Sequence, residues 1–215
     1  MEFIRKLNYK NKDIFYIKLN SKFEEEYINL VECYCDYQDL ERLNNYIFKK
    51  DKQRHLSSII LQKFVIKKYT GIKDDYKKIK LLRTSSCKPY FVFDNKNIEY
   101  NVSHDKDIII IIYSEKYQVG IDIMSFEQEE RVNNISIKFY KTEEENINKL
   151  KLWTLIESYY KSMGKSISNI DNRNFYFNES DNEIIIYKNN ILLKNFNFHT
   201  FYIDNYIISI TEIIK

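Results

Sequence analysis

Apolar and polar positions repeat along the chain with periods that predict strands and helices. Residues 2–20 alternate weakly, which predicts one or two strands, and residues 22–50 carry a helical period. A long helix is predicted from about Thr142 to Met163, before four strand-like runs between Phe175 and the C-terminus. Short β-branched and aromatic runs between polar turns predict further strands, at residues 89–93, 97–103, 107–113 and 117–123.

The clearest helix of the first half lies between Asp51 and Tyr69. Asp51 is a candidate N-cap, and Gly71 follows the helix as a C-terminal stop signal. The apolar stripe that should face the core consists of Leu56, Ile59, Ile60 and Phe64.

The elements run in the order strand, helix, strands, and then strand, helix, strands again. We therefore expect an α+β fold that is a pseudo-dimer of two similar halves, each a small antiparallel sheet packed on a long helix. The halves are residues 1–115 and 116–215, and no Pro- or Gly-rich linker separates them. No sequence repeat demonstrates a duplication.

Composition limits the classes of protein. The 215 residues are 44% hydrophobic and 30% charged, which is ordinary for a globular domain. Lys+Arg 34 against Asp+Glu 31 gives a net charge of +3, a mild bias towards anionic partners and far from the balance of a nucleic-acid-binding protein. Charges interrupt the N-terminal stretch, which therefore reads as neither signal peptide nor membrane span.

The three cysteines do not suggest a disulfide framework. Cys33 and Cys35 lie too close in sequence for easy bridging, and Cys87 leaves the number odd. We expect free thiols in a reducing compartment, and a cytoplasmic monomer.

An aspartate interrupts the apolar strand at residues 117–123. A period of two places Gly120 and Asp122 on the same face, opposite Val119, Ile121 and Ile123. A carboxylate there requires a cationic partner, which could be a Lys or Arg side chain or a ligand. The glycine beside it could allow close approach of a ligand or of another backbone.

The predicted second helix has two faces at the 3.6-residue period. Leu152, Ile156, Tyr159 and Met163 form the core face, and Trp153, Glu157, Lys161 and Gly164 line another. Glu157 and Lys161 are four residues apart, so one interpretation is a solvated ion pair on the helix surface.

Two further groups of polar residues could bind an anion. Lys49, Lys50, Lys52 and Arg54 lie at the start of the first helix, where basic residues oppose the helix dipole and an external anion would explain them better. Asn101 to Asp105 mark the end of a strand and the turn after it, and include Ser103 and His104.

Several catalytic patterns can be set aside. Ser103, His104 and Asp105 are adjacent, and adjacent strand residues point in different directions, whereas the members of a catalytic triad converge in space. The sequence contains no Gly-rich phosphate loop, HExxH or CxxC.

Taken in order, these motifs resemble the 4′-phosphopantetheinyl transferases, in the larger type that activates peptide and polyketide synthases and related enzymes. The match runs from about residue 50 to 167. It is carried by Arg54, Lys88-Pro89, Asn101-Val102-Ser103-His104, Gly120-Ile121-Asp122-Ile123 and Trp153-x₃-Glu157-Ser158-x₂-Lys161-x₂-Gly164-Lys165.

The resemblance implies that coenzyme A and an apo acyl or peptidyl carrier protein are the partners, and that Mg²⁺, or Mn²⁺ in its place, is the metal. It further implies coenzyme A in the cleft between the halves, with Asp122 and Glu157 holding the metal against the pyrophosphate. Lys161 would bind the pyrophosphate, and Glu157, directly or through a metal-bound water, would take the proton of the carrier serine. The implied coenzyme A contacts are Arg54, Lys88, Pro89, Ser103, His104, Lys161 and Lys165.

Two positions depart from the pattern of many relatives. Met124 stands where many have a further acidic metal ligand, and a thioether is a poor ligand for Mg²⁺, so we expect either Asp105 or a water molecule to supply the missing oxygen. Ile156 stands where many have a lysine. Both departures leave open a degenerate relative that binds coenzyme A or a carrier protein without transfer. A second alternative, a small anion- or RNA-binding protein, would need exposed aromatic residues on a basic face.

Overall fold

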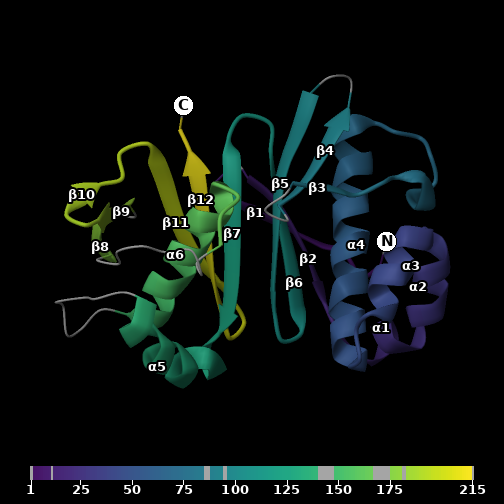
Figure 1. The fold of residues 1–215 in the computed structure, drawn as a ribbon, viewed down its shortest axis with the longest axis horizontal. Coiled ribbons are helices and arrows are strands. Elements are labelled where there is room, and N and C mark those ends of the chain that lie inside the picture. The colour runs from purple at the N-terminus through teal and green to yellow at the C-terminus, as the bar shows by residue number, and fades with distance from the viewer. Residues whose placement is uncertain are drawn as a thin grey trace. The chain divides into compact units, whose positions relative to one another are not determined.

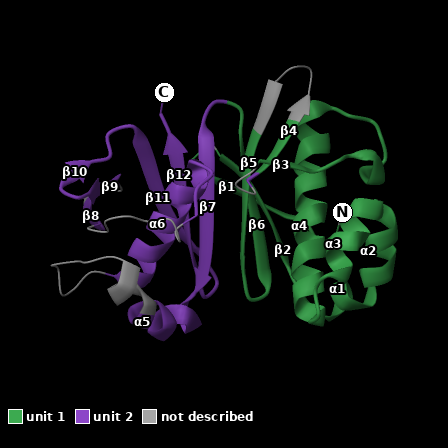
Figure 2. Ribbon diagram, in the orientation of Figure 1, with its two compact units in different colours: residues 1–85, 89–115 green, residues 86–88, 116–215 purple. Residues whose placement is uncertain are grey.

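The computed structural model describes residues 2–10, 12–84, 88–93, 96–139, 148–166, 175–180 and 183–214. The chain folds as two compact units (Figure 2): residues 1–85 with 89–115, and residues 86–88 with 116–215. Helices and antiparallel strands occur in both, so the α+β fold class is confirmed.

The first unit is a six-stranded sheet in the order β1-β2-β6-β5-β4-β3, with helices on it (Figure 1). Strands β2, β6 and β5 lie side by side and are antiparallel. The strands are β1 (Arg5–Tyr9), β2 (Lys12–Lys18), β3 (Leu82–Arg83), β4 (Pro89–Phe93), β5 (Lys96–Asp105) and β6 (Ile108–Ser114). The helices are α1 (Ser21–Glu25), α2 (Tyr27–Tyr34), α3 (Tyr37–Asn44), α4 (Lys49–Thr70) and the short 3₁₀ helix η1 (Tyr76–Lys78).

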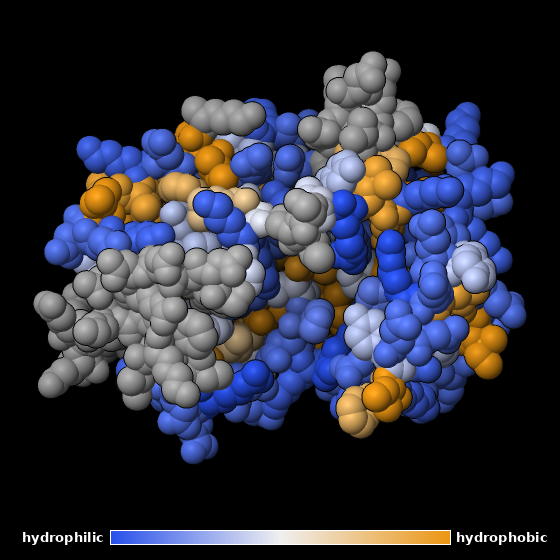
Figure 3. Space-filling model, in the orientation of Figure 1, coloured by the Kyte–Doolittle hydropathy of each residue, from blue (hydrophilic) through white to orange (hydrophobic). Residues whose placement is uncertain are grey.

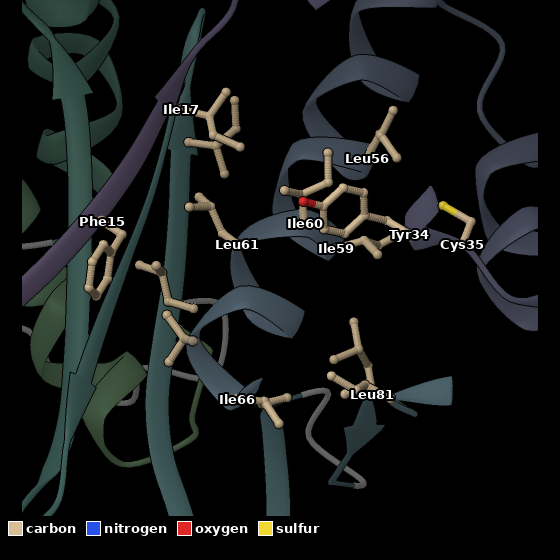
Figure 4. Close-up of a cluster of buried hydrophobic side chains, with 14 of the residues drawn as sticks. Phe15, Ile17, Tyr34, Cys35, Leu56, Ile59, Ile60, Leu61, Ile66 and Leu81 are labelled. Atoms are coloured by element: carbon tan, nitrogen blue, oxygen red, sulfur yellow. The ribbon is translucent and has the colours of Figure 1, made fainter. Parts of the chain in front are cut away.

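Helix α4 is the centre of the first core. Its side chains contact Phe15 and Ile17 of the sheet on one side and Tyr34 and Cys35 on the other (Figure 4). Gly71, at φ 71°, ends the helix in the left-handed conformation that glycine adopts most easily, as its place in the sequence predicted. The predicted N-cap was wrong: the helix begins at Lys49, so Asp51 lies in its first turn.

The second unit is also a six-stranded sheet with a long helix. Its strands run in the order β10-β9-β11-β12-β7, and β8 pairs with β9. The strands are β7 (Gln118–Ser125), β8 (Phe175–Ser180), β9 (Glu183–Lys188), β10 (Ile191–Leu192), β11 (Phe196–Ile203) and β12 (Tyr206–Ile213). The helices are the 3₁₀ helix η2 (Phe126–Gln128), α5 (Glu129–Phe139) and α6 (Lys149–Ser162).

The strands predicted from residue 89 to residue 123 are confirmed, with ends shifted by a few residues. The last part of the chain contains five strands where four were predicted, because the two-residue β10 has too little sequence to give a pattern. Residues 142–147 of the long helix predicted from Thr142, and Cys87, lie outside the described residues. Asn148 caps α6 by accepting a hydrogen bond from Lys151 N, so the described helix begins at Lys149.

The two units share a strand order. In each, the strand before the long helix pairs with the last strand of the unit: β2 with β6, and β7 with β12. The last strand in turn forms a hairpin with the strand before it, β5 with β6 and β11 with β12. Similar topology is what a pseudo-dimer requires, and the pseudo-dimer itself stays a prediction.

The structure also bears on the expectations for the cysteines and for membrane-spanning helices. Cys33 and Cys35 are both free thiols, the first exposed and the second buried. Within the described residues, no helix is long and apolar enough to cross a membrane.

Candidate functional site

Asp122 lies in the middle of β7, with 5% of its surface exposed. Gly120, on the same face two residues earlier, lies directly against helix α6. A Cβ atom at Gly120 would stand 2.0 Å from the carbonyl oxygen of Ser158 and 2.4 Å from the amide nitrogen of Ser162. Of the two reasons that the sequence allowed for this glycine, the structure therefore shows the close approach of another backbone.

Helix α6 is buried on almost every side. Its predicted core residues are buried, apart from the half-buried Met163, but Trp153 is also buried in the hydrophobic cluster, so its assignment to the other face was wrong. Only one strip, with Glu157 and Lys161, is half-buried. The helix ends at Ser162 and is followed by Gly164, at φ 67°, and the amides of Gly164 and Lys165 donate to Lys161 O and Tyr160 O.

The ammonium of Lys161 forms a salt bridge with Asp122, at 2.5 Å between Nζ and Oδ1. A lysine partner was one of the two explanations for the buried aspartate. The sequence also allowed an ion pair between Lys161 and Glu157 along the helix surface. The structure instead shows Lys161 of the helix bonded to Asp122 of the strand. The close packing at Gly120 explains the difference, because it brings β7 within reach of the Lys161 side chain.

Glu157 has a strongly perturbed acidity. Burial first, and then the negative charge of Asp122, raise the pKa of its carboxyl group, Lys161 acts in the opposite direction, and the resulting pKa is about 7. Among the described residues, the site therefore places the carboxylates of Asp122 and Glu157 beside the ammonium group of Lys161. Such an arrangement gains from a further cation, and at neutral pH it also provides a carboxylate able to accept a proton.

The residue types of this site fit a magnesium ion. Mg²⁺ prefers oxygen ligands and typically takes one or two carboxylates from the protein, with phosphate and water oxygens completing its coordination. Asp122 and Glu157 supply two such carboxylates. Among the described residues, no group of three or more His, Cys, Asp or Glu side chains is arranged to hold a metal.

Met124 and Ile156, the two departures from the family pattern, are both packing residues. Met124 contacts the hydrophobic cluster of the second unit, and Ile156, with 1% of its surface exposed, is part of it. Neither side chain can take over the role of an acid or a lysine.

In the first unit, Arg54 joins α4 to the turn between β5 and β6. Its Nε donates to the carbonyl oxygen of Lys106 at 2.7 Å, and its Nη1 lies 2.7 Å from Asp51 Oδ1. Other basic side chains of the first helical turn also have acidic partners within the unit, Lys49 with Glu24 and Lys50 with Asp107. Internal carboxylates therefore account for part of the charge that the sequence led us to assign to an external anion.

Ser103, His104 and Asp105 all lie in β5, so the predicted turn at these residues was wrong, and the turn comes at Lys106. The alternation of the strand buries Ser103 and exposes His104, in line with the exclusion of a triad. Asp105 is half-buried and belongs to the first unit, whereas Asp122 belongs to the second. Its assignment as a metal ligand stays a prediction.

The remaining predicted contacts lie near the end of α6 and at the start of β4. Lys88 donates to the carbonyl oxygen of Ser162 at 3.2 Å, in the last turn of the helix, where carbonyl groups lack helical partners. Lys165 is exposed just beyond this end. Pro89 begins β4 and pairs with Arg83.

Nothing in the sequence indicated that the turn between β5 and β6 lies beside the first turn of α4. In the structure, Lys50 pairs with Asp107 of that turn, and Arg54 donates to the carbonyl oxygen of Lys106. The hydroxyl residues Ser209 and Thr211, which contact α6, were also missed. The signal available for them was the alternation of small polar and apolar residues along β12.

Comparison with known proteins shows a similarity to one family of transferases. A family model described as the N-terminal part of 4′-phosphopantetheinyl transferases matches residues 22–116. A 4′-phosphopantetheinyl transferase from Aneurinibacillus migulanus is 24% identical over 194 residues, which cover 83% of this chain and 76% of the relative. The chain is therefore similar to 4′-phosphopantetheinyl transferases, through the family model in its first half and through this relative over most of its length.

Two mammalian proteins match a shorter part of the chain. L-aminoadipate-semialdehyde dehydrogenase-phosphopantetheinyl transferases from Mus musculus and Homo sapiens are 29% and 28% identical, over 58% of this chain. The aligned part spans 43% of these mammalian relatives, less than half their length. These relatives are named as transferases, which places the chain in an enzyme family of the transferase class.

Proposed function

We propose that the chain transfers the 4′-phosphopantetheine moiety of coenzyme A to a serine hydroxyl of an apo carrier protein, with Mg²⁺, and releases 3′,5′-ADP. The observation that carries the proposal is the pair of carboxylates beside Lys161, in which the pKa of Glu157 is raised to about 7. The residue types and their order along the chain match the family motifs, and the relatives support the reaction class.

Asp122 and Glu157 would hold the metal. When bound, a divalent cation neutralises the charge of the pyrophosphate and of the two carboxylates. Because the cation favours the ionised form of both acids, it lowers the pKa of Glu157 and relieves the repulsion between the carboxylates.

Each side chain of the second unit then has a distinct task in the transfer. The serine oxygen attacks the β-phosphorus of coenzyme A, and the bond from this phosphorus to the bridging oxygen breaks, so that 3′,5′-ADP leaves. Glu157 takes the proton of the serine hydroxyl. Lys161 neutralises the charge that develops on the leaving phosphate, since its ammonium group stands beside the same carboxylate.

The first unit would contribute phosphate-binding groups. Arg54 and His104 are assigned to the 3′-phosphate or the pyrophosphate, since guanidinium and imidazolium groups bind phosphate with charge-assisted hydrogen bonds. Arg54 is held in place by Asp51 and by the carbonyl of Lys106, so its orientation is fixed before a ligand arrives. Ser103, Lys88, Pro89 and Lys165 complete the proposed set of coenzyme A contacts.

A single assay tests the activity. The protein is mixed with coenzyme A, Mg²⁺ and several apo carrier proteins from peptide, polyketide and fatty acid synthesis, and the carriers are examined by mass spectrometry. We expect one or more carriers to gain the mass of the phosphopantetheine arm. No gain with any carrier would contradict the proposal, and retained coenzyme A binding in that case would support the degenerate relative.

The degenerate relative is favoured by one observation, the use of Met124 and Ile156 in packing. The RNA-binding alternative has less support, because tyrosines such as Tyr34, Tyr100 and Tyr159 are buried and cannot stack on bases.

A further inference from the structure

Four buried hydroxyl groups join helix α6 to strand β12. Thr154 Oγ1 lies 2.7 Å from Ser209 Oγ, and Ser158 Oγ lies 2.7 Å from Thr211 Oγ1. All four side chains are fully buried. Thr154 and Ser158 are about one helical turn apart, and Ser209 and Thr211 are alternate residues on one face of the strand. The two pairs therefore form a ladder between the helix and the sheet.

The donors of this ladder follow from the single proton that each hydroxyl carries. Thr154 donates to Lys151 O at 3.0 Å, and Ser158 donates to Leu155 O at 2.9 Å, both within the helix. With these protons used within the helix, Ser209 would donate to Thr154 and Thr211 to Ser158, while Thr200 Oγ1, 3.2 Å from Ser209 Oγ, is a further partner of Ser209. Removing the hydroxyl of Ser209 or Thr211 therefore breaks the hydrogen bond between β12 and α6. Thr154 and Ser158 still have their acceptors within the helix, Lys151 O and Leu155 O.

The ladder lies beside the carboxylate site. In the pairing of β12 with β7, Ser209 is opposite Asp122 and Thr211 is opposite Gly120. On the helix, Ser158 is next to Glu157, and its carbonyl oxygen is the atom that a Cβ at Gly120 would meet. The hydroxyl pairs thus fix the helix segment that carries Glu157 against the part of the sheet that carries Asp122.

We propose that Ser209 and Thr211 are positioning residues of the carboxylate site. Through Thr154 and Ser158 they hold Glu157 and Lys161 at the separation from Asp122 that cation binding requires. Neither residue touches a reacting group. The effect on transfer rests on the proposed function, whereas the position of Lys161 and the binding of a cation can be measured without it.

The test compares the double variant Ser209→Ala, Thr211→Val with the wild-type protein. We expect the contact of 2.5 Å between Lys161 Nζ and Asp122 Oδ1 to lengthen beyond hydrogen-bond distance in the crystal structure. Affinity for Mn²⁺, measured by electron paramagnetic resonance without substrate, should fall roughly 10-fold or more. Turnover should fall by a similar factor, while the KM for coenzyme A stays within about twofold.

Two further variants separate positioning from stability. Ser162→Ala removes a buried hydroxyl that donates only to Tyr159 O, at 2.7 Å within α6, and should leave Mn²⁺ affinity and turnover unchanged. Thr211→Ser with Ser209 intact keeps the link and should behave like the wild type. If the double variant does not fold, Thr211→Val alone, which keeps the shape of the side chain, takes its place and should show the same changes to a smaller extent.

An unchanged Lys161–Asp122 contact and unchanged Mn²⁺ affinity in the double variant, with only a lower Tm, would overturn the proposal. If the wild-type protein modifies no carrier, the proposed function fails. The distance between Lys161 Nζ and Asp122 Oδ1 in the double variant still decides whether the hydroxyl ladder positions Lys161.

Discussion

Helices α4 and α6 each carry a lysine that forms a salt bridge with a buried aspartate of another element. In the first unit, Lys63 Nζ lies 2.7 Å from Asp39 Oδ2 and 2.8 Å from Tyr34 O, and both side chains are almost completely buried. In the second unit, Lys161 is bonded to Asp122 in the same way, but Glu157 adds a second carboxylate. The first cluster pairs one carboxylate with one ammonium group, whereas the second, among the described residues, places two carboxylates beside one ammonium group.

This difference separates a structural ion pair from a candidate site. A balanced, hydrogen-bonded pair holds α3 and the end of α2 to α4 and needs no ligand. An unbalanced group has a carboxyl with a pKa near 7, which is unfavourable to ionise until a cation arrives. Buried charge alone therefore does not mark the site, whereas the excess of carboxylate over ammonium does.

Glu157→Gln should have the largest effect on function. The amide can neither accept the serine proton nor ligate Mg²⁺ as an anion, so we expect transfer to fall by on the order of 10⁴-fold. The mass assay under single-turnover conditions measures this. Glu212→Gln, at a buried carboxylate of the same unit, is the matched control and should stay within about twofold of the wild type. Near-normal turnover of Glu157→Gln would remove this residue from the mechanism.

Asp39→Ala should have the largest effect on stability. It leaves the ammonium of Lys63 buried without its partner, which typically costs about 3–5 kcal/mol. Asp122→Asn should cost much less, since Lys161 reaches solvent and Glu157 loses a repulsive neighbour. Urea denaturation at neutral pH gives both values. Equal losses in the two variants would mean that the clusters do not differ as we describe.

Gly120→Ala should destabilise the second unit by roughly 3 kcal/mol, because its methyl group would overlap backbone atoms of α6. Gly71→Ala is the control, since no atom lies within 4 Å of its Cβ position and only the positive φ costs about 1 kcal/mol. A Tm for Gly120→Ala above that of Gly71→Ala would contradict the close packing of α6.

The acidity of Glu157 predicts a pH dependence of stability. Its pKa is raised from the usual 4.5 to about 7, so between these values the folded state binds the proton more tightly than the unfolded state. The free energy of unfolding should therefore fall as the pH rises through this window, by up to about 3 kcal/mol. Glu157→Gln has no proton to lose there and should be more stable than the wild type at pH 8, and similar at pH 5. Urea denaturation at pH 5 and pH 8 measures the difference in the free energy of unfolding between the variant and the wild type. The same difference at both pH values would disprove the raised pKa.

Asp105→Ala should have the smallest effect. If Asp105 supplies the oxygen that Met124 cannot, the variant needs a few-fold higher Mg²⁺ concentration for half-maximal transfer. Asp107→Ala, at the acidic residue paired with Lys50, is the control and should leave the requirement unchanged. Identical Mg²⁺ dependence in all three proteins would rule out Asp105 as a substitute ligand.

The sequence predicted most of the strands and both long helices, because alternation and helical period are local signals. Residue type alone singled out Gly120 and Asp122, whereas Glu157 was assigned to the site only through the family resemblance, and its role stays a prediction. Local signals could not decide the partner of Lys161. The sequence allowed Glu157, four residues away on the helix, whereas the structure selects Asp122, 39 residues away, because α6 lies directly against Gly120.

Two other features depend on contacts between distant parts of the chain. Trp153 was assigned to the face of Glu157 and Lys161, but it is buried in the hydrophobic cluster of the second unit, to which residues far away in the sequence contribute. The contacts of Ser209 and Thr211 with α6 follow from the pairing of β12 with β7, which no pattern near either residue encodes.

Carbon-13 NMR of labelled glutamate, with Glu157→Gln to assign the signal, tests the account most directly by following the ionisation of Glu157 with and without Mg²⁺. Without the metal, we predict a pKa of about 7 for this carboxyl. Saturating Mg²⁺ should lower the pKa well below that value, because the cation binds the ionised carboxylate beside Asp122. A pKa that Mg²⁺ leaves unchanged would contradict the central claim that Asp122 and Glu157 form a cation site.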